Sequence, residues 1–414
     1  MKAEELIAAA EQKLVQQFEE ADRMEQLRTK QILDIFRKYE VSARHFNPTT
    51  GYGYDDVGRD TLEKIFADLF ETEEAIVRPQ IASGTHALSL CLFGLTLPGD
   101  RIVSATGLPY DTLHTIIGIG ETTPPGSLKE MGISFDSVPL SDIGEIDVDA
   151  VDRAIDERTT LVIAQRSRGY DWRASLTPDR FEKLANMIHQ KHPGVTLMVD
   201  NCYGEFVCDK EPTHYGADVC VGSMIKNPGG GLAPNGGYIA GTKKAIDKIS
   251  WRLTAPGVGR EIGSYAASYQ PFYQGLFMAP HTVNQALKTA MLAAAVFEKL
   301  GLATSPSSDA KRADIIQAIR MERPERLVDF CQGIQSASPV DSMALPEPWD
   351  MPGYSDPVIM AAGTFVSGAS VELSADAPMR SPFTVYMQGS LTYTHGKIAL
   401  CEALNRMIAH GSIA

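Results

Sequence analysis

The sequence predicts an α/β protein, with a large domain built on a mostly parallel sheet and a smaller α+β domain at the C-terminal end. Between about residue 60 and residue 245, short β-branched runs alternate with helical segments, which is typical of a parallel sheet with helices on both faces. The chain has 414 residues, 44% of them hydrophobic, so it can bury a large core and form two or three domains.

Residues 1–60 are expected to form a helical arm followed by an interface loop. No Gly or Pro occurs before Asn47, and apolar residues recur at helical spacing among charged and polar ones. Pro48 disfavours helical angles at Asn47, and two glycines follow it within the loop. The apolar stripe of the arm must be covered elsewhere and the loop is free to reach another subunit, so we expect a homodimer or homotetramer.

Residues 61–280 form the predicted large domain. Its expected strands are short β-branched runs, in the order Ala75–Val77, Arg101–Ser104, Thr160–Ala164, Thr196–Val199, Asp218–Val221 and Gly237–Ala240. Residues 281–414 are expected to contain a helix that begins near Pro280 and links the domains, and then the smaller domain.

Composition limits the class of ligand and the compartment. Acidic residues outnumber basic ones by 52 − 38 = 14, which argues against nucleic acid or an anionic membrane as the partner and favours a small molecule. No run of eighteen apolar residues is present, and residues 1–20 are charged throughout without an apolar signal region, so a cytoplasmic location is expected. The six cysteines show no metal-ligand spacing and are expected to be reduced and mostly buried.

Two of the expected strands end in or near an ionisable residue. One segment ends at Asp200, and the other runs from Val219 to Lys226 and is followed by a glycine-rich turn. Ligands bind at the carboxyl ends of parallel strands, so both charges are expected in one crevice. A lysine there suits Schiff-base chemistry, and the carboxylate would keep a pyridine nitrogen protonated. A structural salt bridge at the strand ends is the alternative interpretation of this pair.

A third segment, Ser83–His86, precedes an apolar helical run and could bind a phosphate at the N-terminus of that helix. Ser223, three residues before Lys226, could add a hydroxyl to the same phosphate. An ordinary helix N-cap at Ser83 and a strand-end serine at position 223 are the alternatives, and His86 is expected to cap the helix.

The order of these parts resembles the methionine γ-lyase-like proteins often labelled aluminium-resistance proteins. They belong to the cysteine and methionine metabolism branch of the fold-type I pyridoxal-phosphate (PLP) enzymes. The resemblance covers most of the chain and rests on four segments: NPTTGYGYDD at 47–56, VRPQIASGTH at 77–86, QRSRGY at 165–170 and MPGY at 351–354.

The resemblance implies a role for each candidate site residue. Lys226 would hold the PLP aldehyde, Asp200 would face the pyridinium nitrogen, and Tyr110 would stack on the ring, although it could also be an ordinary loop tyrosine. The residues implied at the phosphate are Ser83, Gly84, Thr85 and Ser223.

Three further residues are implied at the edges of the site. In this branch a tyrosine and an arginine of the neighbouring subunit complete the phosphate site, and Tyr54 and Arg59 match best, with Tyr52 as an alternative. Arg380 is expected to bind the substrate carboxylate through its planar guanidinium, a surface arginine being the competing interpretation.

The resemblance implies a PLP-dependent lyase that acts on a sulfur-containing amino acid by β- or γ-elimination. The better-known lyases commonly have Ser-Gly-Met where this chain has Ser83-Gly84-Thr85, and a hydroxyl residue where it has Ile225. These departures leave the substrate open, because one cofactor cradle serves many reactions. Aldolase or aminotransferase chemistry is the alternative, as is a PLP-binding protein without turnover that acts in metal or metabolite tolerance.

Overall fold

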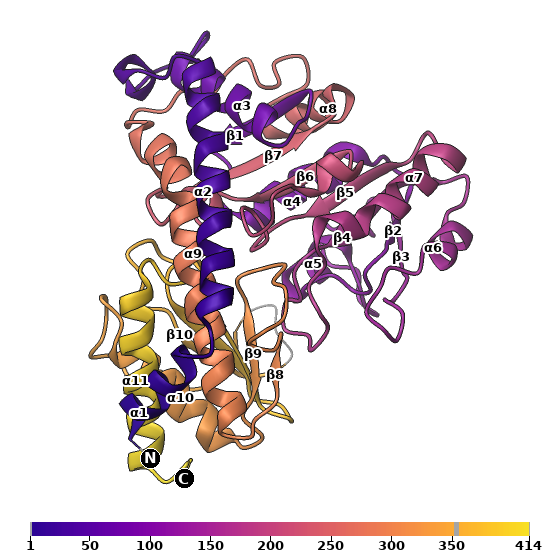
Figure 1. Ribbon diagram of the computed structural model, residues 1–414. Coiled ribbons are helices and arrows are strands. Elements are labelled where there is room, and N and C mark those ends of the chain that lie inside the picture. The colour runs from indigo at the N-terminus through magenta and orange to yellow at the C-terminus, as the bar shows by residue number, and fades with distance from the viewer. Residues whose placement is uncertain (1, 352–355, 414) are drawn as a thin grey trace.

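Two sheets organise the chain in the computed structural model, which describes residues 2–351 and 356–413 (Figure 1). The large sheet has seven strands in the order β1-β7-β6-β5-β4-β2-β3, and the small sheet has five in the order β10-β11-β12-β9-β8. This arrangement confirms the predicted α/β fold with a second, smaller sheet. Of the MPGY segment, Pro352, Gly353 and Tyr354 lie outside the described residues.

All six predicted strands of the large sheet are confirmed. The strands are β1 (Glu74–Arg78), β2 (Arg101–Ser104), β3 (Ser134–Ser137), β4 (Thr159–Gln165), β5 (Thr196–Asp200), β6 (Val219–Ser223) and β7 (Gly237–Gly241). Only β7 runs antiparallel to its neighbours, and the other pairings are parallel. The edge strand β3 was not predicted, because its sequence SFDS lacks a β-branched run and alternates between exposed and half-buried residues.

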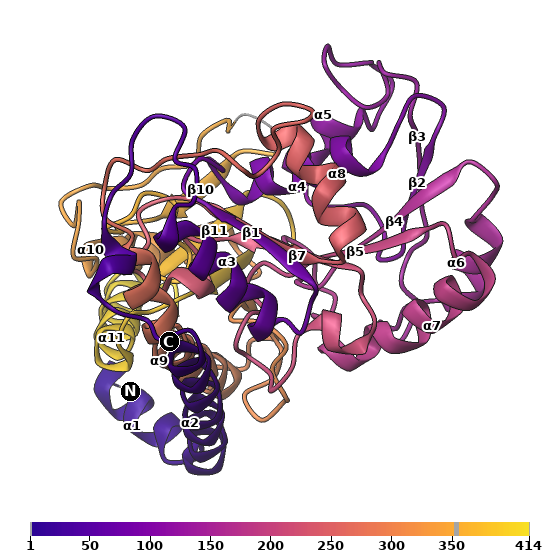
Figure 2. The same ribbon diagram turned by 90° about the horizontal axis from the view of Figure 1, so that it is seen from above.

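Helices cover both faces of the large sheet (Figure 2). One face packs against α4 (Gly84–Leu95), α5 (Asp111–Ile117) and α8 (Lys243–Leu253), and the other against α3 (Val57–Leu69), α6 (Val148–Ala154) and α7 (Glu182–Lys191). Successive strand residues belong to opposite faces: Ile102 packs with the first group and Val103 with the second. This explains why the strands are apolar at nearly every position.

The small sheet is antiparallel and packs against helices. Its strands are β8 (Thr304–Ser305), β9 (Gln317–Arg320), β10 (Val358–Ala361), β11 (Ser374–Pro378) and β12 (Thr384–Gln388). The helix α10 (Pro324–Ser336) packs on β10 and β11, and α11 (Tyr393–Ala409) packs on α10. Short 3₁₀ turns occur at Ala43–Phe46, Pro178–Phe181, Pro212–Tyr215 and Asn227–Gly229.

The linking helix α9 spans Gln270–Lys299, so the expectation that it begins near Pro280 was wrong. Pro280 lies inside the helix, and another proline, Pro271, occupies the first turn, where its missing N–H costs nothing. Pro280 therefore did not mark the start of this helix.

The N-terminal arm packs along this linking helix of its own chain. It consists of α1 (Ala3–Glu11) and α2 (Val15–Lys38), and α2 runs beside α9 (Figure 1). Ile32 of α2 is completely buried, and Phe18, Ile35 and Phe36 pack against the core. The apolar stripe is thus covered within the chain, and it does not by itself require a second subunit.

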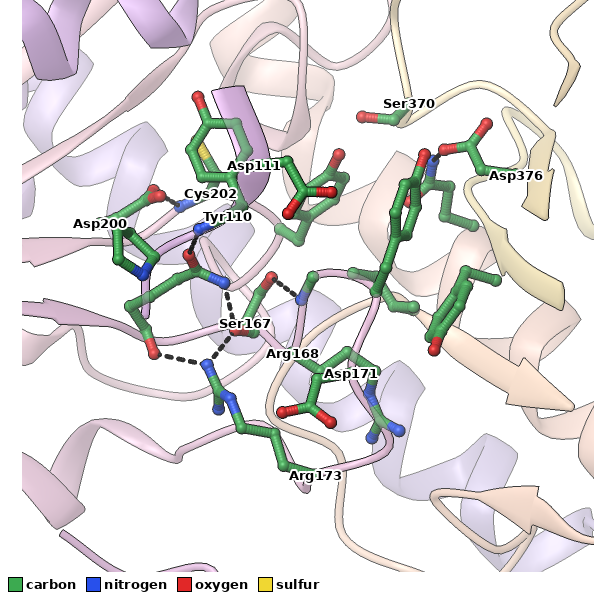
Figure 3. Close-up of a pocket in the computed structure, with 18 of the residues that line it drawn as sticks. Tyr110, Asp111, Ser167, Arg168, Asp171, Arg173, Asp200, Cys202, Ser370 and Asp376 are labelled. Carbon is green, nitrogen blue, oxygen red and sulfur yellow. Dashed lines mark hydrogen bonds between the residues drawn. The ribbon is translucent and has the colours of Figure 1, made fainter. Parts of the chain in front are cut away.

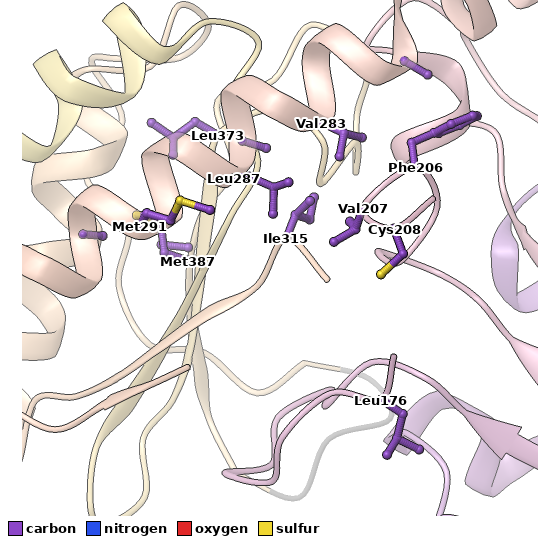
Figure 4. Close-up of a cluster of buried hydrophobic side chains, with 14 of the residues drawn as sticks. Leu176, Phe206, Val207, Cys208, Val283, Leu287, Met291, Ile315, Leu373 and Met387 are labelled. Atoms are coloured by element: carbon purple, nitrogen blue, oxygen red, sulfur yellow. The ribbon is translucent and has the colours of Figure 1, made fainter. Parts of the chain in front are cut away.

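The core continues along α9 from one domain to the other (Figure 4). Val283 and Met291 of α9 belong to one buried cluster with Phe206 of the large domain and Met387 of the small domain. All six cysteines are unpaired, and five of them are buried, as expected. Within the described residues, no helix is long and apolar enough to cross a membrane.

Candidate active site

A cavity of about 1150 Å³ lies between the two sheets. Its walls come from the segments after β4, β5 and β6 of the large sheet and from β11 and β12 of the small sheet. Figure 3 shows Asp200, Cys202 and Tyr110 on one side of the cavity and Ser370 and Asp376 on the other. The cavity thus occupies the edge where parallel strands of an α/β sheet bind ligands.

Lys226 and Asp200 both line this cavity, as the strand-end pattern predicted. Asp200 is the last residue of β5, and Lys226 follows the neighbouring strand β6. The Asp200 carboxylate accepts a hydrogen bond from the Cys202 N–H at 3.1 Å. The Lys226 ammonium lies over the ring of Tyr203, with Nζ 3.8 Å from its centroid. Adjacent strands therefore bring an amine and a carboxylate into one cavity.

Burial and charge act in opposite directions on this pair. Burial raises the pKa of Asp200 above its usual value, although the positive charge of Lys226 works against this rise. Burial also acts to lower the pKa of Lys226, but the acidic groups around it, with Cys202, Tyr203 and Asp200 foremost, outweigh burial and raise that pKa. Each charge of the pair thus favours the ionised form of the other.

The N-terminus of α4 forms the second part of the site. The Ser83 hydroxyl caps this helix by accepting from the His86 N–H at 3.0 Å, and His86 in turn accepts from the Ala82 N–H at 3.0 Å. A Cβ on Gly84 would lie 3.2 Å from the Cβ of Ser223, so any side chain at position 84 would crowd Ser223. The Ser223 hydroxyl is buried and has no hydrogen-bond partner among the described residues. A hydroxyl without a partner beside a helix N-terminus is a place where an anion fits.

Tyr110 contacts both the start of α4 and the end of β4. Its hydroxyl lies 2.7 Å from Thr85 Oγ1, and its backbone N–H donates to the Gln165 side chain at 2.9 Å. Burial raises the pKa of Tyr110 to about 12, and the Asp200 carboxylate adds to the shift. Tyr110 is therefore neutral at physiological pH, and it lines the same cavity as Lys226.

Arg380 lines the cavity from the small domain but is half exposed. Its guanidinium forms an ion pair with Asp356 at 3.1 Å and donates to the Tyr170 carbonyl at 3.5 Å. Arg380 thus lies where it can reach a ligand, although it is partly engaged by other groups.

Arg168 and Asp376 are among the charged residues of the cavity that were not predicted from the sequence. Arg168 is only 2% exposed, and Asp376 accepts from the Gln388 side chain at 3.0 Å. Burial raises the pKa of Asp376 to about 6, although Tyr170 and Gln388 lower it by hydrogen bonding. Arg168 belongs to the QRSRGY segment, which carried the resemblance but received no role, and no local signal marked Asp376.

The structure does not bring the three interface-loop residues to the cavity of their own chain. Tyr52 and Tyr54 are 68% and 62% exposed. Arg59 is buried, but its guanidinium donates to the Gly53 carbonyl at 2.7 Å and forms an ion pair with Asp60 at 2.7 Å. Within the described residues, none of the three lines the cavity.

The residues present fit PLP. A half-buried amine, a carboxylate on the next strand, a neutral tyrosine and an unpartnered hydroxyl beside a helix N-terminus supply partners for an aldehyde, a ring nitrogen, a ring face and a phosphate. Fold and site together define an α/β protein of the fold-type I class, the fold of PLP-dependent enzymes. The PLP-dependent protein YhfS of Escherichia coli has this fold, with a TM-score of 0.63 at 16% identity over 94% of this chain and 97% of YhfS.

The chain belongs to the methionine gamma-lyase family, whose model matches residues 3–408. It is similar to the uncharacterized protein YnbB of Bacillus subtilis (strain 168), with 50% identity over 91% of this chain and 90% of that protein. It is also similar to a solved structure named carbon-sulfur lyase involved in aluminum resistance, from Clostridium novyi NT. That structure has 45% identity and a TM-score of 0.94 over 98% of this chain and 96% of its own.

Proposed function

We propose that this protein is a PLP-dependent carbon–sulfur lyase that eliminates a sulfur group from Cβ or Cγ of an amino acid. The observation that carries the proposal is the convergence of Lys226, Asp200 and the unpartnered Ser223 hydroxyl on one cavity beside the N-terminus of α4. Membership of the methionine gamma-lyase family and similarity to a structure named carbon-sulfur lyase support it.

Three residues of the cavity would do the chemical work. PLP, when bound, withdraws electrons from the substrate Cα. Lys226 would hold the cofactor by its aldehyde and, once displaced by substrate, its Nζ would move the Cα proton. Asp200 would keep the ring nitrogen protonated, and Tyr110 would cover one face of the ring. Asp200 is buried and Lys226 and Tyr110 are half-buried, so bulk water has limited access to the reacting groups.

The remaining contacts would fix the two ends of the bound molecules. The N–H groups at the start of α4 and the Ser223 hydroxyl would bind the phosphate, and Arg380 would bind the substrate carboxylate. Tyr54 and Arg59 of a second copy would complete the phosphate site in a homodimer or homotetramer. Their position outside the cavity of their own chain is consistent with this shared site.

A second candidate is retro-aldol cleavage of a hydroxy-amino acid. Serine hydroxymethyltransferase of Pyrococcus horikoshii is 29% identical over 47% of this chain, whereas homocysteine/cysteine synthase of Kluyveromyces lactis is 30% identical over 51%. The second similarity favours sulfur chemistry. Transamination, and PLP binding without turnover in metal or metabolite tolerance, are further alternatives.

Purified holoprotein tested with cystathionine, methionine and threonine separates these candidates. Release of keto acid, ammonia and thiol supports the lyase, release of an aldehyde supports the aldolase, and retained PLP absorbance without product supports a binding protein. Lys226→Ala should abolish turnover, and borohydride reduction with peptide mapping should place the cofactor on Lys226. Cofactor on another lysine would overturn the site assignment.

A further inference from the structure

Arg168, in the QRSRGY segment, has no part in the proposed cofactor site, yet it is buried in the wall of the same cavity. Its Nη1 donates to Ser305 Oγ at 2.8 Å, which is the only hydrogen bond of its guanidinium within the described residues. Its Nε is buried without a partner. The backbone of Arg168 is held by the Ser175 hydroxyl at 3.2 Å. The guanidinium is therefore held in place while most of its donors stay unused.

The other arginines of the cavity differ from Arg168 in this respect. Arg173 donates to the carbonyls of Ala174 and Gln165 at 3.0 and 2.9 Å, so its guanidinium serves the loop. Arg380 is half exposed and forms the ion pair described above. Arg168 is thus the buried cation of the cavity wall whose hydrogen bonds are left for a ligand.

A second buried guanidinium strengthens the positive potential around Arg168. The three guanidinium nitrogens of Arg312 are buried without partners among the described residues. Burial lowers the pKa of Arg312 to about 10, and the nearby charge of Arg168 contributes to this lowering. Asp314 lies near both arginines, and its carboxylate, which also accepts from Ser175 Oγ and the Ile316 N–H, offsets part of their positive charge. It makes no hydrogen bond to Arg168 among the described residues, so an anion at Arg168 would still meet a donor that the protein does not satisfy.

Arg168 lies in a different part of the cavity from Lys226. The Arg168 guanidinium donates to Ser305 of β8, whereas the Lys226 ammonium lies over the ring of Tyr203 after β5. The cavity volume of about 1150 Å³ also exceeds the roughly 300 to 1,000 Å³ of common small-molecule sites. Both residues line this one cavity, so it extends from Lys226 to Arg168.

We propose that Arg168 binds a second carboxylate of the substrate, carried on the group that leaves with the sulfur. The inference rests on the proposed function and names its substrate class: thioether amino acids with a carboxylate at the far end of the chain. A guanidinium binds a carboxylate through two parallel hydrogen bonds, and burial strengthens such bonds. Arg168 is then a specificity-determining residue of the large domain, separate from Arg380 at the small domain.

Two probes of equal size test the proposal: S-(2-carboxyethyl)-L-cysteine and S-(2-carbamoylethyl)-L-cysteine, which differ only in the charge of the terminal group. For the wild-type protein, kcat/KM should favour the acid by roughly 10- to 100-fold. Arg168→Gln should abolish the preference while turnover of the amide stays within about threefold. Arg168→Lys keeps the charge but loses the bidentate geometry, so it should keep part of the preference.

Controls separate this selectivity from damage to the fold. Arg158→Gln removes an exposed arginine outside the cavity and should leave both rates unchanged. Arg380→Lys should lower both rates together. An equal loss for both probes in Arg168→Gln, or a preference for the acid that survives the substitution, would overturn the proposal. If Arg168→Gln does not fold, the same criteria apply to Arg168→Lys.

Binding measurements distinguish failure of this proposal from failure of the lyase function. Calorimetric Kd values for both probes are measured with Lys226→Ala holoprotein, with and without Arg168→Gln. If the wild-type protein turns over neither probe but the Lys226→Ala protein binds the acid more tightly in an Arg168-dependent way, the carboxylate site stands and the lyase proposal fails on these compounds. Equal affinities for acid and amide overturn the carboxylate site.

Discussion

Replacing Ser223 by alanine should change the stability of the apoprotein and its affinity for PLP in opposite directions. Ser223 is 1% exposed and lies beside Gly84 at the start of α4. Its hydroxyl has no hydrogen-bond partner among the described residues. Without an anion, the hydroxyl is a buried polar group whose lost hydration is not replaced. With a phosphate present, the same hydroxyl makes a hydrogen bond to a charged group.

The two effects have different sizes. A hydrogen bond to a charged group contributes about 1.5 to 3 kcal/mol, so Ser223→Ala should raise the Kd for PLP by roughly 10- to 150-fold. Removing an unsatisfied buried hydroxyl should leave the free energy of unfolding of the apoprotein unchanged or raise it by up to about 1 kcal/mol. Urea unfolding of the apoprotein and fluorescence titration with PLP measure the two quantities.

Ser412→Ala is the matched control. The Ser412 hydroxyl is also buried, but it donates to the Asp329 carboxylate and lies outside the cavity. Its loss should destabilise the apoprotein by about 1 to 3 kcal/mol and leave PLP affinity unchanged. If Ser223→Ala behaves like this control, losing stability while keeping its affinity for PLP, the assignment of Ser223 to the phosphate is wrong.

Three further predictions concern the ring nitrogen, the subunit interface and a buried acid. Asp200→Asn should still bind PLP but should slow single-turnover reaction by about 100-fold or more, and an unchanged rate would remove Asp200 from the mechanism. Mixing inactive Lys226→Ala chains with inactive Arg59→Ala chains should restore activity, because a mixed dimer then holds one intact site; no recovery in verified mixed dimers would exclude a shared site. Burial raises the pKa of Glu205 from 4.5 to about 8, so the folded state holds an extra proton between these values and the free energy of unfolding should fall as pH rises through this window. Glu205→Gln should abolish this fall, as urea unfolding at pH 6 and pH 8.5 would measure, and an unaltered pH dependence would contradict the assignment.

The sequence predicted the parts of the site that depend on local pattern. Asp200 and Lys226 could be found because each follows an apolar strand, and parallel strands bring their carboxyl ends together. Ser83 and Gly84 could be found because capping residues mark the start of a helix. These features are encoded within a few residues along the chain, so the sequence alone was enough to predict them.

Only the tertiary structure decided which distant side chains meet in the cavity. The sequence does not distinguish Arg168 from its neighbours Arg166 and Arg173, and the burial of Arg168 against Ser305 depends on how the two domains pack. The stripe of the arm could have faced a second subunit, but α9 of the same chain covers it. Arg59, which the resemblance places at a phosphate site, is buried but lies outside the cavity of its own chain. The sequence by itself therefore determined six strands of the large sheet, the helix cap at Ser83 and the strand-end charges. Long-range packing determined which side chains become partners, because burial depends on residues far away in the chain.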